Sequence, residues 1–151
     1  TYEVSVTDAD PGHVPATPRK PETETMLTAV RQLNYAIVLC DDLDCMKTFY
    51  RDLFAFPVQS ESETGLTFRA GPVLLSQRKR TREYDGCGSR AELPGVQLAF
   101  LVSPSEVDQC YDQLLEKGVK ILEPPTDQPR GHRTVYFADP EGNMLEVYAE
   151  I

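Results

Sequence analysis

The sequence predicts an α+β fold of two β-α-β-β-β modules whose strands form a curved mixed sheet around a central cleft. One observation is an internal repeat, in which apolar positions of two amphipathic helices align at a constant offset of 64. These aligned positions are Leu43, Met46 and Tyr50 in one helix and Val107, Cys110 and Leu114 in the other. The other observation is that one short apolar strand precedes each helix and three follow it. Because each module has one helix to cover one sheet face, the opposite faces are free to curve around a common cleft.

The first module is expected at about residues 33–78. An apolar run at 35–40 predicts a buried strand, and three aspartates just after it offer helix caps and negative charge in the first turn. Helical spacing of apolar residues then continues until Pro57, which ends the helix. Three short strands are expected at 57–60, 66–70 and 72–77, separated by glycine-containing turns.

The second module is expected at about residues 95–151. It begins with a strand at 96–102, followed by a helix that ends at Gly118 because glycine readily adopts the left-handed C-terminal conformation. A strand at 119–122 and a loop at 124–131 follow. The chain then closes with a hairpin between residues 134 and 148.

The closing hairpin contains the residue that most needs a functional explanation. Its turn, Asp139-Pro-Glu-Gly-Asn143, combines a fixed proline φ with two residues that tolerate positive φ. After this turn, period-2 alternation puts Leu145, Val147 and Ala149 on a core face. The other face carries Glu146 between Met144 and Tyr148, which is more typical of a cavity wall than of open solvent.

Composition limits the classes of partner. A net charge of −9 over 151 residues argues against nucleic acid and anionic membranes. No apolar run approaches the ~18 residues of a membrane span, and no secretory signal pattern is visible at the start. The four cysteines form no C-x-x-C pair and no zinc-binding spacing, so we expect reduced thiols in a cytoplasmic protein.

Residues 1–25 are expected to form an extended arm outside the compact domain at 26–151. Proline, acidic residues and threonine dominate this segment. Tyr2, Val4 and Val6 alternate with polar residues, so the tip is predicted to add as a strand to a sheet edge of its own or of a partner subunit. An ordered tail without function is the alternative. Residues 78–94, which are polar and include Arg78, Lys79, Arg80 and Arg82, are interpreted as the linker between the modules.

The repeat, the Phe49-Tyr50 pair and the closing DPEGNMLE segment at 139–146 together resemble the vicinal-oxygen-chelate superfamily. This superfamily includes glyoxalases, bleomycin-resistance proteins and extradiol dioxygenases, and the resemblance covers about residues 33–151. It implies metal ligands on the first and last strands of each module. In this chain those positions are filled by Tyr35, Leu75, Gln97 and Glu146.

These four residues make a poor site for a divalent ion. Leu75 donates nothing, and a phenol with an ordinary pKa near ~10 would have to ionise before it could bind a cation well. Histidine cannot readily substitute, since the chain has only His13 and His132. We therefore expect no metal and no other cofactor.

The resulting hypothesis is a metal-independent small-molecule binding protein, similar to the bleomycin-resistance branch of the superfamily. The expected ligand-binding residues are Tyr35, Leu75, Gln97, Arg133, Tyr136 and Glu146. Glu146 would bind a cationic or hydrogen-bonding group. Two alternatives stay open: a glyoxalase-like lyase or isomerase using Glu146 as base or metal ligand, and a dimeric scaffold with a vestigial cleft. The resemblance also implies a homodimer.

Overall fold

The structure is a computed structural model that describes residues 27–30, 32–86 and 95–151. The chain divides into two compact units, Thr1–Gln32 and Leu33–Ile151. The predicted arm at 1–25, with its edge strand near the start, lies outside the described residues. All elements named below belong to the second unit.

The first module has the predicted element order. Strand β1 (Tyr35–Cys40) leads into α1 (Leu43–Leu53), and the strands β2 (Val58–Ser62), β3 (Gly65–Ala70) and β4 (Val73–Lys79) follow. The sheet order is β1-β4-β3-β2, with β1 parallel to β4 and antiparallel pairs elsewhere. As predicted, Asp42 caps α1 by accepting a hydrogen bond from the Cys45 N–H at 3.0 Å.

The second module repeats this order. It comprises β5 (Gln97–Leu101), α2 (Glu106–Glu116), β6 (Ile121–Gln128), β7 (His132–Ala138) and β8 (Met144–Glu150). Its sheet order is β5-β8-β7-β6, and β5 is parallel to β8. Gly118 follows α2 with a φ of 67°, the left-handed conformation expected there.

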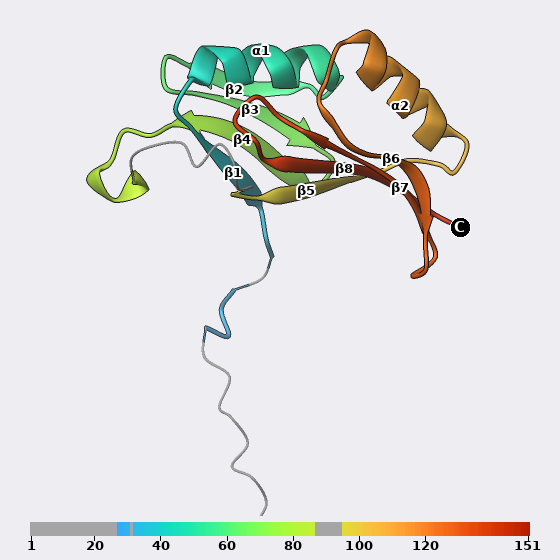
Figure 1. The fold of residues 1–151 in the computed structure, drawn as a ribbon. Coiled ribbons are helices and arrows are strands. Elements are labelled where there is room, and N and C mark those ends of the chain that lie inside the picture. The colour runs from blue at the N-terminus through green and yellow to red at the C-terminus, as the bar shows by residue number, and fades with distance from the viewer. Residues whose placement is uncertain (1–26, 31, 87–94) are drawn as a thin grey trace, which may run out of the picture. The chain divides into compact units, whose positions relative to one another are not determined.

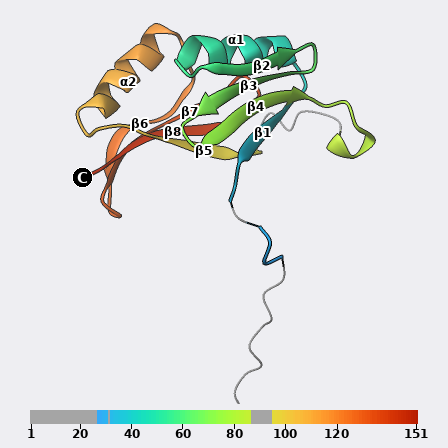
Figure 2. The same ribbon diagram turned by 180° about the vertical axis from the view of Figure 1, so that it is seen from behind.

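Both helices lie on the same side of the strands, which leaves the other sheet faces open (Figures 1 and 2). The helix-facing residues of the strands form one core with the apolar stripes of α1 and α2, and among the fully buried side chains are Met46, Tyr50, Phe68, Val135, Phe137 and Leu145. The fold class predicted from the sequence is therefore confirmed.

Strand β6 is longer than predicted. The expected strand stopped at residue 122, and residues 124–131 were expected to be loop, but β6 continues through Pro124 and Pro125 to Gln128. Two register shifts interrupt its pairing with β7 around these prolines. Proline is tolerated there because β6 is an edge strand, where an N–H is not needed by a second neighbour.

The predicted linker at 78–94 contains structure at its start. Strand β4 runs to Lys79, and a short 3-10 helix, η1, spans Glu83–Asp85. Asp85 accepts two hydrogen bonds from the Arg78 guanidinium, at 2.7 and 3.0 Å, which together with backbone N–H bonds hold the pKa of its carboxyl well below the ordinary value. Residues 87–94 lie outside the described part of the chain.

Within residues 27–30, 32–86 and 95–151, no helix combines the length and the apolar character needed to cross a bilayer.

Candidate functional site

Glu146 lies in the middle of β8, on the sheet face away from the helices. Its neighbours Leu145 and Val147 point into the core, as the period-2 alternation predicts. Glu146 itself is only 6% exposed although it carries a carboxylate. Strand β5 supplies one neighbour and strand β7 another, since Glu146 pairs with Ala99 in the parallel ladder and with Tyr136 in the antiparallel one.

Three polar side chains surround this carboxylate. The Gln97 Nε2 amide donates to Glu146 Oε2 at 3.0 Å, and the Tyr136 hydroxyl donates to Oε1 at 3.3 Å. The Arg130 guanidinium lies 3.7 Å from the same Oε1 and donates to the Tyr136 hydroxyl at 2.7 Å. We call these four residues, Gln97, Arg130, Tyr136 and Glu146, the Glu146 cluster. A buried carboxylate needs such partners because its desolvation is costly.

A cavity of about 340 Å³ opens beside the Glu146 cluster. Gln97 and Tyr136 line it, together with Leu122, Met144, Glu123 and Gln128. Its walls combine the apolar side chains of Leu122 and Met144 with several polar groups, and small-molecule sites likewise combine apolar surface with convergent polar groups. Its volume is near the lower end of the roughly 300–1,000 Å³ that such sites usually have.

The structure brings together Gln97, Tyr136 and Glu146 of the predicted ligand-binding residues, but not the other three. Tyr35 lies on β1 of the other sheet with 43% of its surface exposed and forms no bond to Glu146. Leu75 faces the helices and is buried. Arg133 points to the helix side of β7, where it pairs with Asp108 at 2.8 Å and Asp127 at 2.7 Å.

Strand register identifies Ser76, not Leu75, as the first-module counterpart of Glu146. Gln97 pairs with Met144 in the second module, and Tyr35 pairs with Leu74 in the first. Two residues further along β8 is Glu146, and two residues further along β4 is Ser76. The resemblance placed this position at Leu75, which follows Gly71 by four residues as Glu146 follows Gly142. Because the β7–β8 turn is three residues longer than the β3–β4 turn, Leu75 and Glu146 lie on opposite faces of their sheets.

Arg130 is the site residue that the sequence reasoning missed. It lies in the turn between β6 and β7, and its side chain is 52% exposed. The segment 124–131 was interpreted as a loop of undetermined direction, so nothing in its pattern placed Arg130 near Glu146. The available signal was the buried carboxylate itself, which requires a cation or several donors nearby.

The closing turn, which carries the superfamily resemblance, has a structural role and does not line the cavity. The Asp139 carboxylate accepts from the Tyr50 hydroxyl at 2.9 Å and from the Asn143 side chain at 2.8 Å. Glu141 Oε1 accepts from the backbone N–H groups of Asp41 at 2.7 Å and Asp42 at 3.2 Å. The turn of the second module therefore holds the segment that leads into α1, whose N-cap is Asp42.

The superfamily resemblance implies a divalent metal, and the residues around Glu146 do not fit one. The described residues include no group of three or more His, Cys, Asp or Glu side chains that could hold a metal ion. The Arg130 guanidinium is already beside the carboxylate, and Gln97 presents its N–H rather than its carbonyl to Glu146. A metal ion needs several oxygen, nitrogen or sulfur atoms that supply lone pairs. The groups around Glu146 instead present N–H and O–H hydrogens to it.

Comparison with known proteins identifies the family. Residues 32–147 match the Glyoxalase/Bleomycin resistance protein/Dioxygenase superfamily. The chain belongs to this superfamily. The same repeat that predicted two modules is thus the superfamily fold, as the resemblance implied.

Relatives of several kinds share this fold. The chain is 31% identical over 119 residues to the uncharacterized protein YraH of Bacillus subtilis, covering 74% of this chain and 92% of YraH. It is 25% identical over 119 residues to the metallothiol transferase FosB of Staphylococcus saprophyticus, covering 79% and 77% of the two chains. A superfamily crystal structure from Nocardioides has a TM-score of 0.67 and 27% identity, covering 83% of this chain and 88% of the other.

Proposed function

We propose that this protein binds a small molecule at the Glu146 cluster without a metal ion, and that the ligand carries a cationic or hydrogen-bond-donating group and an aromatic or apolar body. The observation that carries the proposal is the charge arrangement at Glu146. The carboxylate is 6% exposed and its guanidinium partner, Arg130, is about half exposed. A ligand cation entering from the cavity would replace a partner that is already close to solvent.

Electrostatics favours this exchange. Arg130 is about half exposed and lies 3.7 Å from the carboxylate, but Glu146 is buried and must keep a cationic partner. A ligand cation can displace Arg130 without leaving the carboxylate uncompensated. A ligand cation that excludes water from the carboxylate would form a charge-assisted hydrogen bond of about 1.5–3 kcal/mol. The apolar side chains of Leu122 and Met144 are available for the body of the ligand.

The test compares a cationic probe with its neutral isostere. We expect benzamidine to bind more tightly than benzamide in isothermal titration, because only benzamidine carries a charge for Glu146. The variant Glu146→Gln removes that charge and should weaken benzamidine by about 10- to 100-fold, which corresponds to the free energy of one charge-assisted bond. The control is Glu150→Gln, which removes an exposed carboxylate from the end of the same strand.

Chelator provides the second arm of the test. Prior dialysis against EDTA should leave benzamidine affinity unchanged. Equal affinity of the wild type and Glu146→Gln for benzamidine would remove Glu146 from the site, and a loss of binding with EDTA would overturn the metal-independent proposal.

A second candidate is an enzyme, a lyase, isomerase or transferase with Glu146 as general base. It is favoured by similarity to proteins named metallothiol transferase, and by a crystal structure of lactoylglutathione lyase from Agrobacterium tumefaciens with a TM-score of 0.64. Turnover of a thiol adduct that depends on added Ni²⁺, Zn²⁺ or Mn²⁺ would establish it over simple binding. A scaffold with a vestigial cleft receives less support, because a cavity of about 340 Å³ adjoins the cluster.

We further propose a cytoplasmic homodimer. Exposed apolar side chains on the edge strand β1, Tyr35 and Ile37, support an interface there. The free thiols of Cys40, Cys45 and Cys110 support a reducing compartment. Light scattering should give twice the monomer mass, and Ile37→Glu should shift the protein to monomer.

A further inference from the structure

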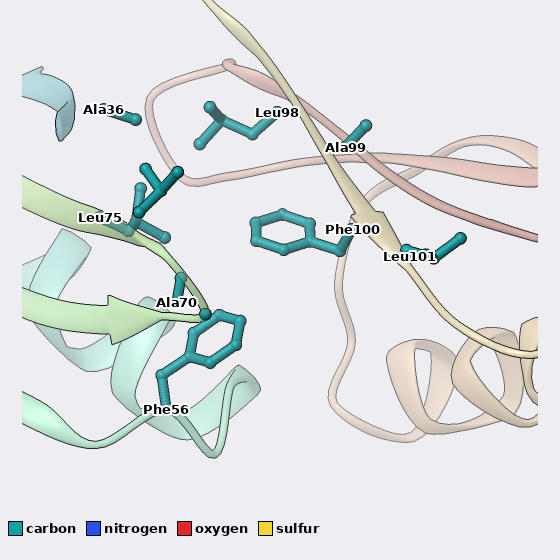
Figure 3. A pocket seen from close by; sticks show the side chains of 10 residues that line it. Ala36, Phe56, Ala70, Leu75, Leu98, Ala99, Phe100 and Leu101 are labelled. Atoms are coloured by element: carbon teal, nitrogen blue, oxygen red, sulfur yellow. The ribbon is translucent and has the colours of Figure 1, made fainter. Parts of the chain in front are cut away.

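A second cavity of about 450 Å³ is lined by residues of both modules (Figure 3). Its walls come from β1, from the β3–β4 hairpin, from β5 and from Phe56 in the segment after α1. None of the four residues of the Glu146 cluster lines it. We call it the junction cavity.

The side chains that line the junction cavity are hydrocarbon. They are all alanine, valine, leucine or phenylalanine, so none of them offers a nitrogen or oxygen. A buried water usually needs two to four polar partners, which means that water is held poorly here. Phe100 points across the cavity toward Leu75, Ala70 and Phe56, and the Phe56 and Phe100 ring centroids are 6.2 Å apart (Figure 3). Such rings provide flat faces for another aromatic ring.

One wall also offers a backbone donor and acceptor. Strand β5 is an edge strand whose described partner is β8. The ladder uses the Val96 carbonyl, which accepts from Met144 at 3.0 Å, and the Val102 N–H, which donates to Tyr148 at 2.9 Å. Because bonding residues alternate along a parallel strand, the peptide groups of Ala99 point away from β8, on the cavity side.

We infer that the junction cavity is a second ligand site, for an uncharged aromatic molecule of one or two fused rings that bears an N–H or O–H donor. The carbon lining excludes a charged ligand, because no side chain of the cavity could compensate its desolvation. The two phenylalanines select a flat ring, and the outward peptide group of Ala99 accepts the donor. The volume is roughly three times the ~150 Å³ of an engineered apolar cavity that binds benzene, so two fused rings fit.

Indole is the probe that tests this site, since it is uncharged, bicyclic and carries one N–H. Titrated into the full chain, it should produce saturable shifts of the methyl signals of Leu75, Leu98 and Ala99 in carbon–proton NMR spectra. The methyl of Met144, which lines the other cavity, should not move. Saturable shifts confined to Met144, or no saturable shift at all, would overturn the inference.

Two variants fill the cavity from different strands. Ala70→Leu, on β3, and Ala36→Leu, on β1, should each weaken indole at least tenfold. The matched control is Ala55→Leu, the same substitution at an exposed alanine outside the cavity lining, which should bind as the wild type does. If Ala70→Leu does not fold, Ala36→Leu decides the result, because Ala36 lies near the start of the edge strand β1 and is only partly buried. Unchanged affinity in a folded cavity-filling variant would refute the site.

The indole measurement tests the junction cavity independently of the proposal that Glu146 binds a cation. Glu146→Gln should leave indole affinity unchanged while it weakens benzamidine. Loss of indole binding in Glu146→Gln would show that indole occupies the cavity of the Glu146 cluster and would overturn the junction site. Failure of benzamidine to bind would leave the indole measurement unaffected.

Discussion

The two modules repeat the same elements but close their last hairpins with different turns. In the first module, Ala70 pairs with Val73, so the β3–β4 turn contains only Gly71 and Pro72. In the second module, Ala138 pairs with Met144, and the turn at 139–143 is three residues longer. The extra length lets Glu141 reach the start of α1. A symmetric repeat thus carries an asymmetric connection, which runs from the second module to the first.

The same asymmetry occurs inside the sheets. At equivalent register positions, the first module has a neutral pair, in which the Thr67 hydroxyl donates to Ser76 at 3.0 Å, and the second has Tyr136 with Glu146. On the core face, the more polar residue is in the first module instead. Gln77 occupies the position that Val147 holds in the second module. Only one of the two sheets therefore presents a charged group to its open face at this position.

The largest expected effect is on the turn that connects the modules. Asp139→Ala removes an acceptor used by the Tyr50 hydroxyl, by the backbone N–H groups of Glu141 and Asn143, and by the Asn143 side chain. Leaving several buried donors without a partner should lower the free energy of unfolding by about 3–4 kcal/mol in urea denaturation. Asp127→Ala, which removes an exposed ion pair, should cost less than about 1 kcal/mol. Equal losses in the two variants would show that the turn does not connect the modules energetically.

A stabilising substitution tests the polar residue on the core face of the first module, Gln77. Gln77 is 0% exposed, and both its amide nitrogen and its carbonyl oxygen have no hydrogen-bond partner among the described residues. Gln77→Met keeps the volume and removes the unsatisfied amide, so it should raise the free energy of unfolding by about 1–2 kcal/mol. The converse substitution, Val147→Gln, should destabilise. A loss of stability in Gln77→Met would indicate a partner for the amide outside the described residues.

A smaller effect is expected at the hydroxyl that joins Arg130 to Glu146. Tyr136→Phe removes the donor to Glu146 and the acceptor of Arg130, while it keeps the ring in the cavity wall. Benzamidine affinity measured by titration should change by about fivefold, equivalent to ~1 kcal/mol for one hydrogen bond. Thr67→Val, at the equivalent position of the first module, should leave the affinity unchanged. A change of the same size in Thr67→Val would place the ligand on the other sheet.

The smallest effect concerns alkaline pH. Burial, followed by the negative charge of Glu141, raises the pKa of the Cys40 thiol from 9.0 to about 12. Since the folded pKa lies above the unfolded one, this contribution to stability is complete below pH 9 and is lost as pH rises toward 12. At pH 9.5 the loss is about 0.8 kcal/mol. Cys40→Val, which copies Val102 of the second module, should abolish this part of the pH dependence of urea unfolding, and an identical pH profile would contradict it.

The sequence predicted the repeated elements because periodicity and turn residues report local geometry. Predictions failed where the outcome depended on contacts distant in the chain. Strand β6 crosses two prolines because it is an edge strand, which composition does not reveal. Arg133 alternates away from Glu146 once the β7 register is set, and Arg130 approaches it through a turn whose direction no pattern specifies. The acid itself was correctly placed, since alternation alone determines its face.

The link from Glu141 to the start of α1 spans 100 positions of sequence. During synthesis the first helix leaves the ribosome long before Glu141, which accepts hydrogen bonds from the two residues ahead of that helix, and Tyr50 likewise precedes its acceptor Asp139. An amino-terminal fragment that ends between the modules would expose the backbone N–H groups of Asp41 and Asp42 and the Tyr50 hydroxyl to water. The two modules therefore share hydrogen bonds that neither module could make alone.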